Sequence, residues 1–131
     1  MQQHVKILAV LHIIFGGLGV LVALCALLFF GGLASFVSMA EQNSDNYIAG
    51  GVLGLIGLVV MIVVLVISLP ELIAGIGLLS YQQWARILTI IISAMELPGF
   101  PFHTALGIYG LWVLLSNEGA ALFTQRPARA V

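Results

Sequence analysis

Charged side chains are scarce in this sequence. Four basic and five acidic residues make up 7% of its 131 residues, against about 25% in a typical soluble domain. Hydrophobic residues make up 62%. So few charges cannot cover the surface of a water-soluble globule of this length. The sequence therefore predicts a single domain for which lipid is part of the solvent.

Two further shortages exclude other classes of protein. The formal net charge is -1, which removes the electrostatic basis for nucleic acid binding. Cys25 is the only cysteine, so an internal disulfide and a cysteine zinc cluster are excluded, and we expect a small buried hydrophobe there. The sequence contains no Ser-His-Asp set, metalloprotease helix motif or phosphate loop. It indicates neither an enzyme nor a cofactor.

Long apolar runs are abundant instead. The first, residues 7–30, exceeds the ~7–15 residues of a signal-peptide core and suffices for the ~20 residues of a membrane span. Three more runs follow, at residues 48–79, 87–97 and 102–115. We expect a membrane domain over residues 1–116 and a cytoplasmic tail without secondary structure over residues 117–131. The expected helices cover about residues 5–32, 47–80, 84–97 and 102–116.

The second apolar run is too long for a simple crossing. As a helix, residues 48–79 would measure about 48 Å at ~1.5 Å per residue, against a hydrocarbon core of ~30 Å. Pro70 lies inside this run and favours a kink. We expect one long helix, tilted and kinked at Pro70. A separate short piece after Pro70 is the alternative.

The placement of charges distinguishes four crossings from three. With four crossings, all basic residues fall on one side: Lys6, Arg86, Arg126 and Arg129. Glu41 and Asp45 then fall on the other side. Because cytoplasmic loops carry the excess of Lys and Arg, this pattern predicts four crossings with both termini in the cytoplasm. If the last two runs form one broken span, the chain crosses three times and the asymmetry disappears.

Aromatic side chains lie near the predicted membrane boundaries, as is typical of membrane proteins. Tyr81 and Trp84 flank Arg86 on the inner side. The outer side has Tyr47, Phe100 and Phe102. In the tail, Phe123 is expected to be a weak headgroup anchor.

Small residues recur at three- and four-residue spacing on every expected helix. Membrane helices pack through small residues because lipid tails already satisfy large apolar side chains. The expected packing positions are Gly16, Gly19, Gly50, Gly54, Gly75, Gly107 and Gly110. The third helix has a more polar stripe, comprising Arg86, Thr89, Ser93 and Glu96. This pattern predicts an all-α, polytopic four-helix bundle.

Glu71 and His12 form the candidate intramembrane polar site. Glu71 is expected near the bilayer centre, where an acidic group costs at least ~2.5–3.5 kcal/mol and would be neutral. It either hydrogen-bonds a neighbouring helix, serves an ion or proton, or lies at an interface. His12 either meets Glu71 or bonds a backbone carbonyl.

Glu96 and His103 flank the outer hairpin, and we expect both to be wet. His12 and His103 lie toward opposite faces of the membrane, so they cannot readily ligate one haem or metal within a chain.

Several segments resemble a pattern among small bacterial membrane proteins of unassigned function. The similar residues are Ala74 to Leu79, Trp84 to Leu88, Phe100 and Pro101, Thr104 to Leu115, and Leu11 to Ile13 with Phe15 and Gly16. The resemblance implies a four-helix topology in a bacterial inner membrane, and it implies no activity. His103 stands where a glycine is expected, so no site role is carried onto it.

The sequence favours a non-enzymatic membrane building block, either a homo-oligomer or an accessory subunit of a larger complex. Its expected partners are the lipid bilayer and other membrane subunits, with no nucleic acid. The alternative is an oligomeric ion or proton channel that uses Glu71 and His12.

Overall fold

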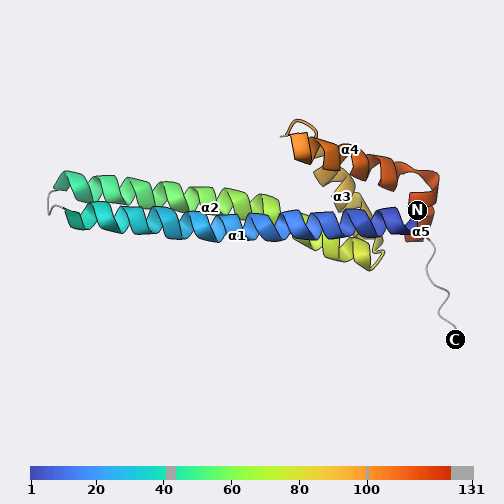
Figure 1. Ribbon diagram of the computed structural model, residues 1–131, viewed down its shortest axis with the longest axis horizontal. Coiled ribbons are helices and arrows are strands. Elements are labelled where there is room, and N and C mark those ends of the chain that lie inside the picture. Colours follow the sequence, from blue (N-terminus) through green and yellow to red (C-terminus); the bar gives the residue numbers. More distant parts are fainter. Residues whose placement is uncertain (41–43, 100, 125–131) are drawn as a thin grey trace. The chain divides into compact units, whose positions relative to one another are not determined.

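A computed structural model describes residues 1–40, 44–99 and 101–124 of the chain. The described part is all-α, as the sequence predicts, and contains five helices (Figure 1). They are α1 (Gln2–Ala40), α2 (Ser44–Leu79), α3 (Gln83–Glu96), α4 (Pro101–Leu115) and α5 (Asn117–Thr124). Some residues used in the sequence analysis lie outside the described ranges: Glu41, Phe100, Arg126 and Arg129.

Within the described residues, α1 and α2 are the two helices long and apolar enough to cross a membrane. A third span is present if α4 and α5, which meet at a bend of 67°, count as one broken crossing. The 39 residues of α1 and 36 of α2 give lengths of about 58 and 54 Å at ~1.5 Å per residue. Both exceed a hydrocarbon core of ~30 Å, so a crossing requires tilt, bending or projection from the membrane.

The chain folds as two compact units. The bundle unit comprises Met1–Gly16 and Pro70–Val131, and the hairpin unit comprises Gly17–Leu69. Since α2 is one helix through Pro70, the alternative of a separate short piece after this proline is wrong. The hydrophobic core lies in the bundle unit, where its buried members are Val5, Leu8, Ala9, Leu78, Leu106, Val113, Leu114 and Phe123.

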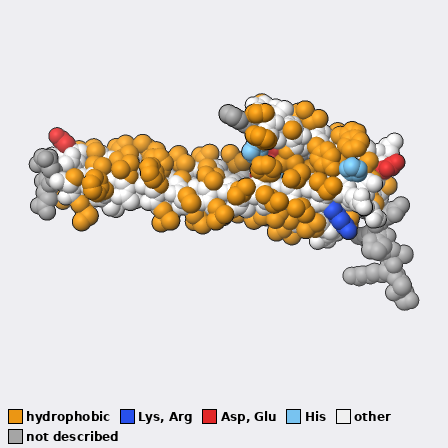
Figure 2. All heavy atoms as spheres, in the orientation of Figure 1, with side chains coloured by type: hydrophobic (Ala, Val, Ile, Leu, Met, Phe, Trp, Pro, Cys, Tyr) orange, Lys and Arg blue, Asp and Glu red, His pale blue; other side chains and the backbone are white. Residues whose placement is uncertain are grey.

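The hairpin unit is a pair of antiparallel helical segments held by a narrow seam of small residues (Figure 1). A Cβ at Gly50 would lie 2.8 Å from the carbonyl oxygen of Ala34, and Gly57 lies against the side chain of Phe30. Away from this seam the large side chains are exposed; Leu28 is 75% accessible. Cys25 is also exposed, which corrects the expectation of a buried thiol. Hydrophobic side chains cover most of the face seen in Figure 2.

Helix α1 continues to Ala40, beyond the end expected near residue 32. Two serine hydroxyls explain the difference. Ser35 Oγ donates to the carbonyl oxygen of Gly31 at 2.9 Å, and Ser38 Oγ donates to that of Ala34 at 2.8 Å. Bonds of this kind satisfy a hydroxyl within its own helix. Polar residues in the expected break are therefore compatible with helix.

Helix α5 corrects the expectation that the segment after residue 116 has no secondary structure. The backbone N–H of Gly119 donates to Ser116 Oγ at 3.0 Å, as in a helix N-cap. Phe123 is buried and lies 5.9 Å from the ring of Tyr81, measured between centroids. It therefore packs inside the bundle unit and is not free to enter the headgroup region.

Tight turns and close contacts hold α2, α3 and α4 together in the bundle unit. Tyr81 has a φ of 50°, and its N–H donates to Leu78 O at the end of α2. The left-handed conformation is typical of a helix C-terminus, although glycine usually occupies it. Between α3 and α4, a Cβ at Gly107 would lie 2.5 Å from the carbonyl oxygen of Ser93. These two helices therefore pack at close backbone distance.

Candidate functional site

His12 is fully buried on α1 in the bundle unit. Its Nδ1 donates to the carbonyl oxygen of Leu8 at 3.0 Å, so Nε2 is the unprotonated nitrogen of the neutral ring. Nε2 is buried and has no hydrogen-bond partner within the described residues. The sequence leaves open whether His12 meets Glu71 or bonds a backbone carbonyl, and the structure shows the backbone bond.

Glu71 lies on α2, one residue after Pro70, and is 5% exposed. Its Oε1 is buried without a hydrogen-bond partner among the described residues. No hydrogen bond or ion pair joins it to His12 in that part of the chain. Because a buried carboxyl without a partner loses its hydration and gains nothing in exchange, this position is costly.

Ser93 and Glu96 bring two more unpartnered polar atoms from α3. Ser93 is fully buried, and neither its Oγ nor Oε2 of Glu96 has a partner within the described residues. The Oγ of Ser93 lies against Gly110 of α4, and Cβ of Glu96 lies 3.3 Å from the Cβ position of Gly107. Both side chains therefore occupy the close contact between α3 and α4.

The contacts of α1 show which way His12 faces. Leu8 and Phe15 contact α4: the Cβ position of Gly110 is 3.5 Å from Leu8 Cδ1, and the Phe15 and His103 rings are 5.3 Å apart. On the side of α2, Ala9, Ile13 and Gly16 contact Gly75 and Leu72. At 3.6 residues per turn, His12 lies between these two faces and points into the bundle.

The same contacts place the four polar side chains at neighbouring levels of the bundle unit. Gly16 is opposite Leu72, so Glu71 lies about one turn beyond His12 along α1. Helix α4 meets α1 at two levels, where Gly110 contacts Leu8 and where His103 contacts Phe15. Gly107 is opposite Ser93 and lies between these two contacts, so it is close to the level of His12. We call His12, Glu71, Ser93 and Glu96 the polar cluster.

Glu96 is half-buried, whereas the sequence analysis expected a wet side chain at the outer hairpin. One of its carboxyl oxygens is buried. His103 is half-buried, with its ring tilted against Phe15. In the sequence, the polar stripe of Thr89, Ser93 and Glu96 already indicated which face of α3 points into the bundle. The nearby Pro98 and Gly99 instead favoured a solvent-exposed turn beside Glu96.

The ionisable side chains of the polar cluster are not gathered as the ligands of a metal ion would be. Within the described residues, no group of three or more His, Cys, Asp or Glu side chains could hold a metal ion. Thr89, one turn before Ser93, is satisfied locally, since its Oγ1 donates to the carbonyl oxygen of Ala85 at 2.7 Å.

The expected packing glycines differ in how closely they meet their neighbours. A Cβ at Gly16 would lie 2.7 Å from Leu72 N, and Gly19 lies against the hydroxyl of Ser68. A Cβ at Gly75 would lie 2.9 Å from the carbonyl oxygen of Ala9. Gly54 is in ordinary contact, 3.8 Å from Ala34 Cβ.

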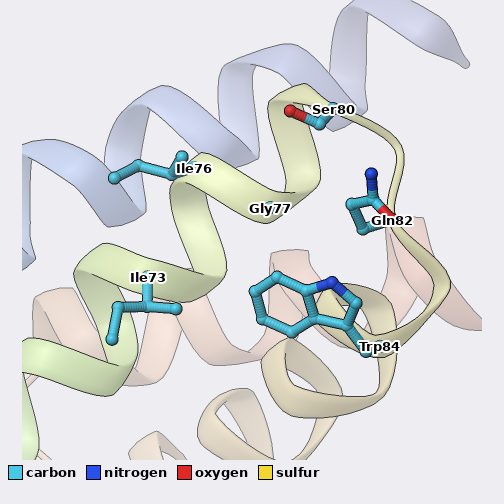
Figure 3. A pocket seen from close by; sticks show the side chains of 6 residues that line it. All are labelled: Ile73, Ile76, Gly77, Ser80, Gln82 and Trp84. Atoms are coloured by element: carbon cyan, nitrogen blue, oxygen red, sulfur yellow. The ribbon is translucent and has the colours of Figure 1, made fainter.

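A pocket of about 410 Å³ opens at the turn between α2 and α3 (Figure 3). Its apolar part is formed by Ile73, Ile76 and Gly77, and its polar part by Ser80, Gln82 and the indole of Trp84. The Trp84 ring lies over Gly77, 2.9 Å from the position of a Cβ there. The pocket shares no residue with the polar cluster, and none of the side chains that line it is ionisable.

A second polar group lies at the end of the bundle unit where α1 begins. His4 Nδ1 and the hydroxyl of Tyr109 form a hydrogen bond of 2.9 Å, and the ring of Trp112 meets His4 edge-on. Arg86 Nε donates to the carbonyl oxygen of Leu114 at 3.1 Å. The sequence analysis missed both contacts because they join residues far apart in the chain.

Comparison with known proteins identifies no relative: no family model, curated protein or solved structure matches this chain.

Proposed function

We propose that the chain is a non-enzymatic building block of a membrane assembly, either a homo-oligomer or an accessory subunit. In this proposal it crosses a bacterial inner membrane four times with both termini in the cytoplasm. Two observations support the membrane setting: α1 and α2 meet the length and hydropathy of spans, and few of their residues are buried. A surface of this kind is stable only in contact with lipid or other apolar helices.

The positions of two described basic residues of the bundle unit, Lys6 and Arg86, agree with the proposed topology and would agree with three crossings as well. Arg86 contacts the end of α4, and His4, one turn or less from Lys6, contacts Tyr109 and Trp112. Lys6 and Arg86 therefore lie at the same end of this unit, as expected when both face the cytoplasm. Helices α3 and α4, at 14 and 15 residues, would supply the short third and fourth crossings.

The observation that carries the proposed assembly is a set of outward glycines in the hairpin unit. A Cβ at Gly17, Gly31, Gly32 or Gly51 would meet no atom of residues 1–40, 44–99 and 101–124 within 4 Å. Glycine inside a helix costs about 0.5–1 kcal/mol relative to alanine, and in membrane helices it serves close approach by another helix. Among the described residues these four glycines have no such neighbour, which favours a helix from another subunit.

The experiment is the mass of the purified particle in mild detergent, measured by light scattering. The wild-type chain should be larger than a monomer, either alone or with a second membrane protein. Gly32→Leu should reduce that mass because a large side chain keeps a second helix from approaching the backbone closely. Val22→Leu, an exposed position on the same helix, should leave the mass unchanged. A wild-type monomer with nothing bound would contradict the proposal.

A second candidate function is an ion- or proton-conducting oligomer. It is favoured by the burial of Glu71 and His12 in the bundle unit, where both have unpartnered atoms. A conducting oligomer should pass current in liposomes, and Glu71→Ala should alter that current. Oligomers without flux would leave only the building-block function.

A further inference from the structure

The pocket between α2 and α3 is divided along the axis of α2 into an apolar end and a polar end (Figure 3). Ile73 and Ile76 lie within α2, whereas Ser80 and Gln82 follow its last residue, Leu79. From Ile73 to Ser80 the chain rises about 10 Å at ~1.5 Å per residue. A ligand that fits this pocket is therefore apolar toward the middle of α2 and polar beyond its end.

Contacts within the bundle unit form this pocket before any ligand enters it. Tyr81 N–H donates to Leu78 O and Gln82 N–H donates to Gly77 O, which are the two bonds of a Schellman motif at the end of α2. The Trp84 ring lies over Gly77, where a side chain would collide with it. These contacts fix the turn and one wall of the pocket, so a ligand does not have to order them.

The polar end presents three hydrogen-bond donors: the hydroxyl of Ser80, the amide of Gln82 and the indole N–H of Trp84. None of these side chains forms a hydrogen bond with another described residue, and Gln82, the N-cap residue of α3, does not cap its helix. The described lining residues carry no charge. The matching ligand therefore has acceptor oxygens and needs no counter-charge from the pocket.

A second pocket of the bundle unit provides a comparison. It has a volume of about 420 Å³ and is lined by Ala105, Ile108, Tyr109 and Trp112 of α4. The hydroxyl of Tyr109 is already bonded to His4 at 2.9 Å. The two pockets are thus similar in volume and each contains a tryptophan, but the lining of the second includes no other hydroxyl and no amide side chain.

We propose that the pocket between α2 and α3 binds one phospholipid of the bilayer. One acyl chain lies on Ile73 and Ile76, and the phosphate or ester oxygens accept hydrogen bonds from Ser80, Gln82 and Trp84. A lipid beside a crossing helix has this same direction, with its chains toward the bilayer middle and its headgroup at the helix end. The volume of about 410 Å³ is within the ~300–1,000 Å³ of ligand pockets. The inference rests on the proposed membrane setting and requires no assembly.

Quenching of tryptophan fluorescence by brominated phosphatidylcholine compares the two pockets, because bromine quenches an indole only at close range. The full chain in dodecyl maltoside micelles is titrated with this lipid as two variants: Trp112→Phe reports on Trp84, and Trp84→Phe reports on Trp112. Trp84 should be half-quenched at a lipid mole fraction at least about fivefold lower than Trp112, because two neutral hydrogen bonds, to Ser80 and Gln82, strengthen binding by about that factor or more.

Removal of these two donors tests the polar end of the pocket. Ser80→Ala combined with Gln82→Ala should raise the half-quenching fraction of Trp84 to that of Trp112. Both positions are exposed and their side chains bond no other described residue, so the fold should persist, which circular dichroism can check. Ile108→Leu, a change in the second pocket, should leave Trp84 unaffected. Brominated phosphatidylglycerol should act like the phosphatidylcholine, because the lining carries no charge.

Several outcomes would overturn the lipid site. Equal half-quenching fractions for the two tryptophans, or no effect of the double variant, would mean that Trp84 meets only the general lipid layer. Quenching of Trp112 alone would mean that detergent or another helix fills the pocket. A fivefold preference for phosphatidylglycerol would mean that charge, rather than the neutral donors, holds the lipid.

Failure of the lipid site can be distinguished from failure of the proposed function. Quenching of neither tryptophan would contradict the membrane setting itself. A monomeric particle would contradict the proposed assembly, and the lower half-quenching fraction of Trp84 would still establish the lipid site.

Discussion

The bundle and hairpin units use the same two helices in different ways. In the bundle unit, the ends of α1 and α2 pack with α3, α4 and α5 around a core and enclose polar atoms. In the hairpin unit, the remaining parts of α1 and α2 pack on each other and expose most of their large side chains. A uniformly apolar helix therefore does not indicate by itself whether a segment is core or surface; its small and polar residues carry that information.

Replacing a buried glycine of the bundle unit and an exposed residue of the hairpin unit should break this comparison most strongly. Gly75→Leu in the bundle unit would place a Cβ 2.9 Å from the carbonyl oxygen of Ala9 and from the backbone nitrogen of Ile13. Backbone atoms cannot move aside, so we expect a loss of at least ~1–3 kcal/mol in the free energy of unfolding. Val59→Leu, at an exposed position of the hairpin unit, should lose almost none.

Unfolding by SDS from mild detergent micelles, followed by circular dichroism, gives both values. Equal losses for the two variants would show that the units do not differ in packing.

Removal of the Arg86 side chain should have the next largest effect. Arg86→Met deletes the bond from the guanidinium to Leu114 O, which closes the end of α4. Charge-assisted bonds contribute about 1.5–3 kcal/mol, and the half-buried position favours the lower end. Lys6→Met, an exposed basic residue of the same unit, is the matched control and should be neutral in the same SDS titration. Equal stability of both variants would contradict this role for Arg86.

The smallest predicted difference compares two hydroxyls on α3. Thr89→Val removes a bond to Ala85 O and should cost about 0.5–1.5 kcal/mol of unfolding free energy. Ser93→Ala removes a hydroxyl that has no partner in the described residues, so it should be neutral or slightly stabilising. A larger loss for Ser93→Ala than for Thr89→Val would show that Ser93 Oγ makes a bond in the folded protein.

Hydropathy was sufficient to predict the all-α class and the two long apolar helices, because runs such as residues 7–30 have no other stable form in lipid. The helix ends were harder to predict. Ser35 and Ser38 look like a polar break, yet their hydroxyls bond within α1. Ser116 as an N-cap with Glu118 in the first turn predicts the helix α5. The polar composition of the tail instead suggested a segment without secondary structure.

The candidate site was predicted only in part. Glu71 and His12 stand out because polar residues are rare in apolar helices. Glu96 belongs to the polar cluster because α3 packs on α4 through Gly107. This contact depends on tertiary structure and cannot be read from spacing along the chain. Four crossings and the cytoplasmic termini remain predictions.

Cysteine labelling tests the four-crossing membrane topology most directly, because Cys25 is the only natural thiol. In a Cys25→Ser background, Asp45→Cys and Glu118→Cys are treated with a membrane-impermeant maleimide in intact and in opened bacterial cells. We predict that Asp45→Cys is labelled in intact cells and Glu118→Cys only after the cells are opened. Labelling of Glu118→Cys in intact cells would contradict four crossings with a cytoplasmic carboxyl end.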